Sequence, residues 1–210
     1  MTSPPRSFVP AAAATLLMLC AVGVPTGAAS AAEPSSATAM IQATVDEVLV
    51  ILKDPKLDAA ARRSRIEQLA GSHFHFETVS KYVVTRYWKS FSDTEKVEFI
   101  EVFKTFLSRT YGDRIERYQD EKVKIVGERP EGRSDVVVMT RIVGGTYDDA
   151  EVNYRLREID GAWRVIDVKI EGISLVMNYR DQFKSFLSRG GAAALLEALR
   201  KKNAEPRPAA

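Results

Sequence analysis

The chain has 210 residues, a length that suits one domain with its own hydrophobic core. Its 30 basic and 28 acidic residues nearly balance, and both signs alternate along segments such as residues 114–124, which is typical of a solvated surface. Proteins that bind nucleic acid usually concentrate basic residues on one face, so no nucleic-acid partner is expected.

The N-terminal residues 1–32 predict an export signal that is cleaved from the mature chain. Arg6 supplies a positive charge, residues 8–24 are mainly apolar, and the small residues 28–32 suit a signal peptidase. The alternative is an uncleaved membrane anchor, but Pro10 interrupts the apolar run and favours cleavage.

The only cysteine, Cys20, lies within the predicted signal. An exported mature chain without thiols has no disulfides, so its hydrophobic core must stabilise it. Residues 33–203 are predicted to form one domain, and the Pro/Ala-rich residues 204–210 to form a disordered tail.

The first part of the predicted domain has the 3.6-residue period of amphipathic helices. One helix is predicted to end before Asp54-Pro55, a second to end at Gly71, and a third to follow it. The residues expected to face inward, helix by helix, are Ile41, Val45, Val48, Leu49 and Leu52; Ile66 and Leu69; and Phe76, Val79 and Val83.

The clearest helix start is the capping box formed by Ser92 and Glu95, whose side chains satisfy unpaired backbone donors. The helix that follows has more apolar residues than a surface stripe needs, so it is predicted to be widely buried or to line a cavity. Its break is predicted at Gly112-Asp113, with another helical turn at residues 114–118. The apolar set is Val97, Phe99, Ile100, Phe103, Phe106, Leu107 and Tyr111.

The period then changes to two, which predicts four antiparallel strands. Asp160-Gly161 is the strongest hairpin signal, because a type I′ turn needs positive φ at both central residues. The predicted strands span residues 123–126, 135–143, 152–159 and 163–170. In the last two, one dry face holds Val152, Tyr154, Leu156, Ile166, Val168 and Ile170.

Helical periodicity returns after Gly172, with Ser174 as the predicted cap and Gly190-Gly191 as a break before a final helix. Residues expected to face inward are Leu175, Val176, Tyr179, Phe183, Phe186, Leu187, Leu195, Leu196 and Leu199. Helices, then a sheet, then helices predict an α+β fold.

The motifs that a single sequence shows most clearly for enzymes are missing from this chain, among them the nucleophile elbow and the P-loop. His73 and His75 would need a third ligand to bind a metal, so a solvated or capping pair is favoured and no metal or cofactor is expected. Asp167 points either to the wet face of its strand or into a pocket. In the second case Asp167 and Tyr154 would suit an isomerase or dehydratase, which is the enzyme alternative.

Several segments resemble the MlaC family, also called the toluene-tolerance auxiliary family, over nearly the whole predicted mature chain. The strongest is the pairing of a Trp-containing strand with a Glu-Gly-Ile-Ser turn and an aromatic helix. The segments are residues 80–88 (SKYVVTRYW), 99–106, 111–112, 163–168 (WRVIDV), 171–175 (EGISL) and 179–183 (YRDQF).

The resemblance implies a nuclear transport factor 2-like fold, in which a curved four-stranded antiparallel sheet, wrapped by N- and C-terminal helices, encloses an apolar cavity. It implies a monomeric, non-enzymatic carrier in the periplasm that shuttles phospholipid between the outer and inner membranes and maintains outer-membrane lipid asymmetry. The implied partners are an inner-membrane ABC transporter with periplasmic lipid-binding domains and an outer-membrane lipoprotein and porin complex. A hopanoid is the alternative ligand.

Withdrawing two acyl chains from a bilayer exposes about thirty methylenes, at about 0.8 kcal/mol each, so the carrier needs an enclosed apolar volume of about 1,000 Å³. The same residues suit an ordinary packed core as the other interpretation. The expected lipid-binding residues are Val83, Phe99, Phe103, Phe106, Leu107, Tyr111, Val152, Tyr154, Leu156, Ile166, Val168, Ile170, Val176, Tyr179 and Phe183. The expected headgroup contacts are Arg86, Lys89 and Tyr147.

Overall fold

A computed structural model of the protein describes residues 35–116 and 120–206. Its first three helices begin at side-chain caps. Ser35 and Asp58 cap α1 and α2, and His75 accepts a hydrogen bond from the Thr78 backbone N–H at 3.2 Å to cap α3. The capping interpretation of His75 is therefore confirmed. Gly71 does not end its helix, which continues by two residues. The helices are α1 (Ser36–Lys53), α2 (Ala59–His73) and α3 (Phe76–Val84).

A 3-10 helix, η1 (Thr85–Ser90), leads to the aromatic helix α4 (Asp93–Glu116). The capping box is confirmed, because the Ser92 N–H donates to Glu95 Oε2 at 2.8 Å and the Glu95 N–H donates to Ser92 Oγ at 3.2 Å. The predicted break at Gly112-Asp113 is wrong. A glycine inside a helix costs only about 1 kcal/mol, and the packing of α4 on its neighbours offsets that cost. Val97, expected to face inward, is 65% exposed.

The described strands form one antiparallel sheet in the order β1-β2-β3-β4-β5, so the α+β prediction is confirmed. The expected four strands are joined by a fifth, β5, which at two residues is too short to show a period. The strands are β1 (Lys122–Glu131), β2 (Asp135–Val143), β3 (Glu151–Ile159), β4 (Ala162–Ile170) and β5 (Ile173–Ser174).

Strand β1 is longer than residues 123–126, because Pro130 does not end it. β1 is an edge strand, where a proline costs no ladder hydrogen bond on its outer side, and Pro130 pairs with Val136. The register of β1 shifts between Ile125 and Gly127. The predicted Asp160-Gly161 hairpin is confirmed, with φ of 52° and 74° at the two residues.

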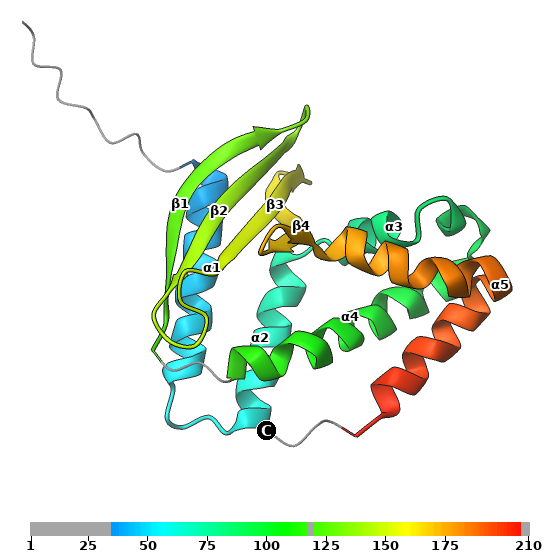
Figure 1. Ribbon diagram of the computed structural model, residues 1–210, viewed down its shortest axis with the longest axis horizontal. Helices are drawn as coiled ribbons and strands as arrows, with labels where there is room; N and C mark the ends of the chain where they lie inside the picture. The colour runs from blue at the N-terminus through cyan, green and yellow to red at the C-terminus, as the bar shows by residue number, and fades with distance from the viewer. Residues whose placement is uncertain (1–34, 117–119, 207–210) are drawn as a thin grey trace, which may run out of the picture. The chain divides into compact units, whose positions relative to one another are not determined.

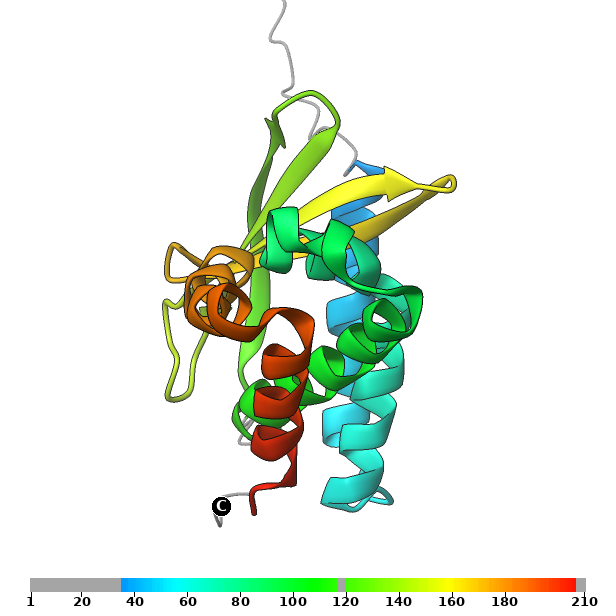
Figure 2. The same cartoon turned by 90° about the vertical axis from the view of Figure 1, so that its right-hand side faces the viewer.

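Helix α5 (Leu175–Ala204) begins at the predicted cap, where Ser174 Oγ accepts a hydrogen bond from the Met177 N–H at 3.1 Å. The predicted break at Gly190-Gly191 is a kink, at which both residues leave helical φ/ψ values. Figure 2 shows the two segments of α5 meeting at an angle. Of the helices in the described ranges, none is long and apolar enough to span a membrane.

The apolar side chains of the described domain form two clusters, which lie among the helices and strands labelled in Figure 1. The sheet cluster joins α1 to one face of the curved sheet, with Ile41, Val138 and Leu156 at its centre. The helix cluster joins α3, α4 and α5. Leu175, at the start of α5, packs against both clusters. The helices therefore divide between the face of the sheet and a layer beside strand β4.

Candidate functional site

The helix cluster is centred on an array of aromatic rings contributed by α4 and α5. The ring centre of Phe103 lies 5.5 Å from those of Phe99 and Tyr179, and 5.6 Å from that of Phe183. The first pair is stacked and the others meet edge to face, which are the favoured aromatic arrangements. These contacts fix α4 against α5 and turn both helices toward one apolar interior.

The predicted lipid-binding residues divide between the two clusters, where a single lining was expected. Nine belong to the helix cluster: Val83, Phe99, Phe103, Phe106, Leu107, Tyr111, Val176, Tyr179 and Phe183. Five belong to the sheet cluster and pack toward α1: Val152, Tyr154, Leu156, Val168 and Ile170. Ile166 is fully buried outside both clusters, where the register between β3 and β4 shifts.

A small cavity lies where the two clusters meet. Its volume is about 30 Å³, and α3, α4, α5, β4 and the α2–α3 link supply its walls. Six of the predicted lipid-binding residues line it: Val83, Phe103, Leu107, Val168, Val176 and Tyr179. The predicted set missed Phe74, Val79, Asp167 and Leu175, which also line it. Inward periodicity had marked Val79 and Leu175, but no local pattern marks Phe74.

The size of this cavity differs from the expectation of about 1,000 Å³. At about 30 Å³ it holds about one water molecule, because the aromatic rings fill most of the space between the helices. A larger surface depression of about 540 Å³ lies beside α1, but its walls come from that helix and the residue after it, from Asp46 to Asp54. An acyl chain therefore requires the helix layer to move away from β4.

Asp167 lines the cavity, and its carboxylate is already engaged. Oδ2 accepts a hydrogen bond from the Ser174 hydroxyl at 2.6 Å, and Oδ1 accepts one from the Val176 backbone N–H at 3.1 Å. The acceptor therefore sits at the N-terminus of α5, where unpaired N–H groups favour a negative charge. This geometry gives Asp167 the role of anchoring α5 to β4.

Asp167→Ala should lower the free energy of unfolding by about 1 to 3 kcal/mol, because it leaves buried donors without their acceptor. Urea unfolding followed by circular dichroism measures the change. Asp181→Ala is the matched control, since Asp181 is exposed on the same helix and should change stability by less than about 0.5 kcal/mol. Equal effects of the two substitutions would contradict the anchoring role.

The residues of the enzyme alternative are not brought together. Asp167 pairs with Arg155, whereas Tyr154 pairs with Val168, so Asp167 and Tyr154 point to opposite faces of the sheet. Burial raises the pKa of Tyr154 to about 12, which keeps its hydroxyl protonated at neutral pH. The isomerase or dehydratase pair therefore has no shared site on this sheet.

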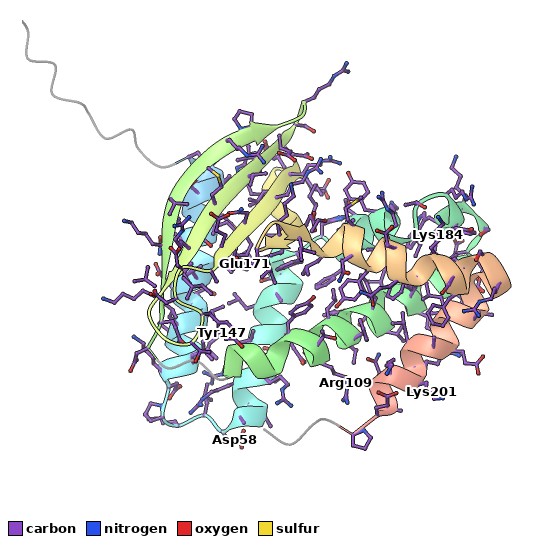
Figure 3. The ribbon with its side chains drawn as sticks, viewed as in Figure 1. Asp58, Arg109, Tyr147, Glu171, Lys184 and Lys201 are labelled. Atoms are coloured by element: carbon purple, nitrogen blue, oxygen red, sulfur yellow. The ribbon has the colours of Figure 1, made fainter. Side chains whose placement is uncertain are left out.

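The predicted headgroup contacts lie in different elements. Arg86 and Lys89 are exposed in η1, and the Arg86 guanidinium donates to the Tyr87 hydroxyl at 3.2 Å. Tyr147, labelled in Figure 3, lies in the loop between β2 and β3. Figures 1 and 2 both show this loop and η1 at separate ends of the domain. One phosphate does not reach all three residues in this arrangement.

A charged group occupies the sheet face opposite α1. Asp135 accepts hydrogen bonds from Arg155 Nε at 2.7 Å and from Arg157 Nε and Nη2 at 2.6 and 2.9 Å. Its side chain is only 2% exposed. This group could not be predicted from the sequence, because its members come from β2 and β3 and only the pairing of these strands brings them together.

The ion pairs of Asp135 predict a loss of stability in acid. Burial alone would raise the pKa of Asp135, but hydrogen bonds from Arg157 and Arg155 lower it overall. The folded pKa then lies below the unfolded value of about 3.9, so the stabilisation is present above about pH 4 and is lost as the pH falls through the folded pKa. Urea unfolding between pH 2 and 7 should show this fall. Asp135→Asn should flatten it, and an unchanged slope would contradict the assignment.

The fold is nuclear transport factor 2-like, an α+β domain with a small apolar cavity between its helices and β4. The family described as MlaC protein matches residues 42–201. The chain therefore belongs to the MlaC family.

The chain is similar to known proteins. The toluene tolerance protein ttg2D of Pseudomonas putida is 25% identical over 157 residues, which are 72% of this chain and 73% of that protein. A phospholipid-binding protein from Ralstonia solanacearum, whose structure was solved in complex with a phospholipid, superposes with a TM-score of 0.73 at 26% identity. That match covers 81% of this chain and 98% of the other.

Proposed function

We propose that this protein is a periplasmic carrier that binds a membrane phospholipid by its acyl chains and shuttles it between the outer and inner membranes. The observation that carries the proposal is the cavity at the junction of the two apolar clusters, with aromatic side chains from α4 and α5 on one side and β4 on the other. Membership of the MlaC family and the phospholipid-bound structure of a similar protein support it.

The carrier needs space that the aromatic rings of the helix cluster fill in this structure. Two acyl chains lose about 20 kcal/mol of hydrophobic stabilisation when they leave a bilayer, so they must be enclosed by apolar surface. The helix layer is joined to β4 by the Asp167 anchor at Val176 and by the hydrogen bond that the His75 backbone N–H donates to the Val165 carbonyl at 3.0 Å. In the proposed loaded form, this layer separates from β4 and the aromatic side chains of α4 and α5 become contacts of the acyl chains.

Native mass spectrometry of the gently purified protein tests the carrier function, followed by extraction and identification of the bound molecule. The expected result is one phospholipid per chain. A stable protein without lipid, which also takes up none from vesicles, would refute the proposal. A bound hopanoid would change the ligand and keep the carrier role.

The proposed route includes two docking partners, an inner-membrane ABC transporter with periplasmic lipid-binding domains and an outer-membrane lipoprotein and porin complex. The family supports these partners, together with a role in outer-membrane lipid asymmetry. Transfer of labelled phospholipid between vesicles that carry each partner tests this part separately. Lipid binding without transfer to either partner would refute the shuttle and leave lipid binding intact.

A further inference from the structure

Three basic side chains gather on the sheet face opposite α1, beside the strand that lines the cavity. Strand pairing places Arg155 across from Asp167, and Lys169 is the next residue of β4 on the same face. Arg157 lies on this face one pair further along β3, across from the buried Asp135 of β2. The group therefore spans two neighbouring strands next to a cavity wall.

Positive charge is in excess here. Four cations form ion pairs with only two carboxylates: Asp135 pairs with Arg155 and Arg157, and Glu131 pairs with Arg129 and, at 3.8 Å, with Lys169. The carboxylate of Asp167, across from Arg155 on the same face, reduces the excess to one positive charge. One phosphodiester carries a single negative charge, so this group has the charge to bind it.

The cations are accessible and held in place. The side chains of Arg155, Arg157 and Lys169 are 31 to 32% exposed, whereas that of Asp135 is 2% exposed. The guanidinium groups of Arg155 and Arg157 both contact Asp135 through Nε and Nη2, and their Nη1 atoms lie outside these contacts. A fixed guanidinium loses less freedom when it binds a phosphate, for which its planar geometry is suited.

Two elements connect this group to the cavity. In β4, the cavity-lining Asp167 and Val168 directly precede Lys169. In α3, Tyr82 directly precedes the cavity-lining Val83, and the guanidinium of Arg157 lies 5.9 Å from the Tyr82 ring centre. Successive same-face residues of a strand are about 7 Å apart, so a headgroup at the basic group would leave its acyl chains close to the cavity.

We propose that Arg155, Arg157 and Lys169 bind the phosphate of the lipid headgroup while the acyl chains occupy the neighbouring cavity. This inference rests on the proposed carrier function and adds the chemical class of lipid that the carrier selects. The ligand class is a lipid with a phosphodiester, and an uncharged lipid with the same chains binds more weakly.

The test compares two fluorescent lipids with identical acyl chains, phosphatidylglycerol and diacylglycerol, on delipidated full-length protein. The wild type should bind phosphatidylglycerol about tenfold more tightly. Lys169→Gln should weaken that binding roughly three- to tenfold and leave diacylglycerol unchanged. Arg155→Gln combined with Lys169→Gln should abolish the preference.

Lys124→Gln is the matched control, because it removes one exposed cation from the same sheet face but from the edge strand β1. It should leave both affinities unchanged. Equal loss with Lys124→Gln and Lys169→Gln would overturn the site in favour of a general charge effect. Lys169→Gln keeps the test valid even when the double variant does not fold, because Lys169 does not contact the buried Asp135.

Two further outcomes separate the inference from the function on which it rests. Equal wild-type affinities for the two lipids would overturn the headgroup site and leave the carrier function standing, whereas binding of neither lipid would overturn both. Inorganic phosphate distinguishes the source of the anion. If it bound in a Lys169-dependent way while the two lipids bound equally, the group would be a free-phosphate site and the inference would be wrong.

Discussion

Phe103→Ala should lower the free energy of unfolding of the lipid-free protein by about 3 to 5 kcal/mol, the usual range for removing a buried phenylalanine. Phe103 is 1% exposed and packs against the rings of Phe99, Tyr179 and Phe183. The substitution removes apolar burial and three ring contacts, and leaves a space that neighbouring rings fill only in part. Urea unfolding of delipidated protein measures the effect.

Val97→Ala on the same helix is the control for Phe103→Ala. Val97 is 65% exposed, so its substitution should change stability by less than about 0.5 kcal/mol. A Phe103→Ala effect as small as that of the control would show that the aromatic array is loosely packed. Saturating phospholipid should recover part of the loss, because a ligand that binds only the folded state stabilises it.

Leu107→Trp should eliminate the bound lipid. Leu107 is half-buried on α4 and lines the cavity, so the larger indole would occupy the space between α4 and β4 that an acyl chain needs. The partial exposure of this position lets the ring shift toward solvent, which limits the cost of overpacking. The measurement is lipid content by native mass spectrometry together with a thermal melt.

Leu156→Trp is the matched comparison, because Leu156 is fully buried in the sheet cluster and does not line the cavity. Overpacking there should destabilise the protein by about 1 to 3 kcal/mol or more, while the folded fraction keeps its lipid. The reverse pattern, with lipid lost from Leu156→Trp and kept by Leu107→Trp, would place the acyl chains between the sheet and α1.

The ends of individual helices and strands could be predicted where one short motif decides them. Ser92 and Glu95 satisfy each other's backbone donors, and Asp160 with Gly161 provides the two positive φ values of a tight turn. These interactions involve residues close in sequence, so they are visible before any tertiary structure exists. The helix break predicted at Gly112 was wrong, because a glycine lowers helix stability by only about 1 kcal/mol, which is small beside the packing energy of a long helix.

The candidate site could be predicted only in part. Periodicity identified which side chains are apolar and which face of each element they share, and it correctly placed Phe103, Tyr179 and Leu156 in the interior. It could not show that the dry face of β3 packs on α1 while the aromatic helix packs on α5. Periodicity reports a buried face and says nothing of the partner that covers it.

The sequence by itself determined the α+β order of elements, the helix caps at Ser92 and Ser174 and the β3–β4 hairpin, since each depends on neighbours along the chain. The balance of charge follows from composition alone. The tertiary structure decided that two apolar clusters meet at a small cavity, that Asp167 anchors α5, and that Asp135 gathers two arginines from β3. These features depend on strand register and helix packing. Residues far apart in the sequence become neighbours only when the whole domain has folded.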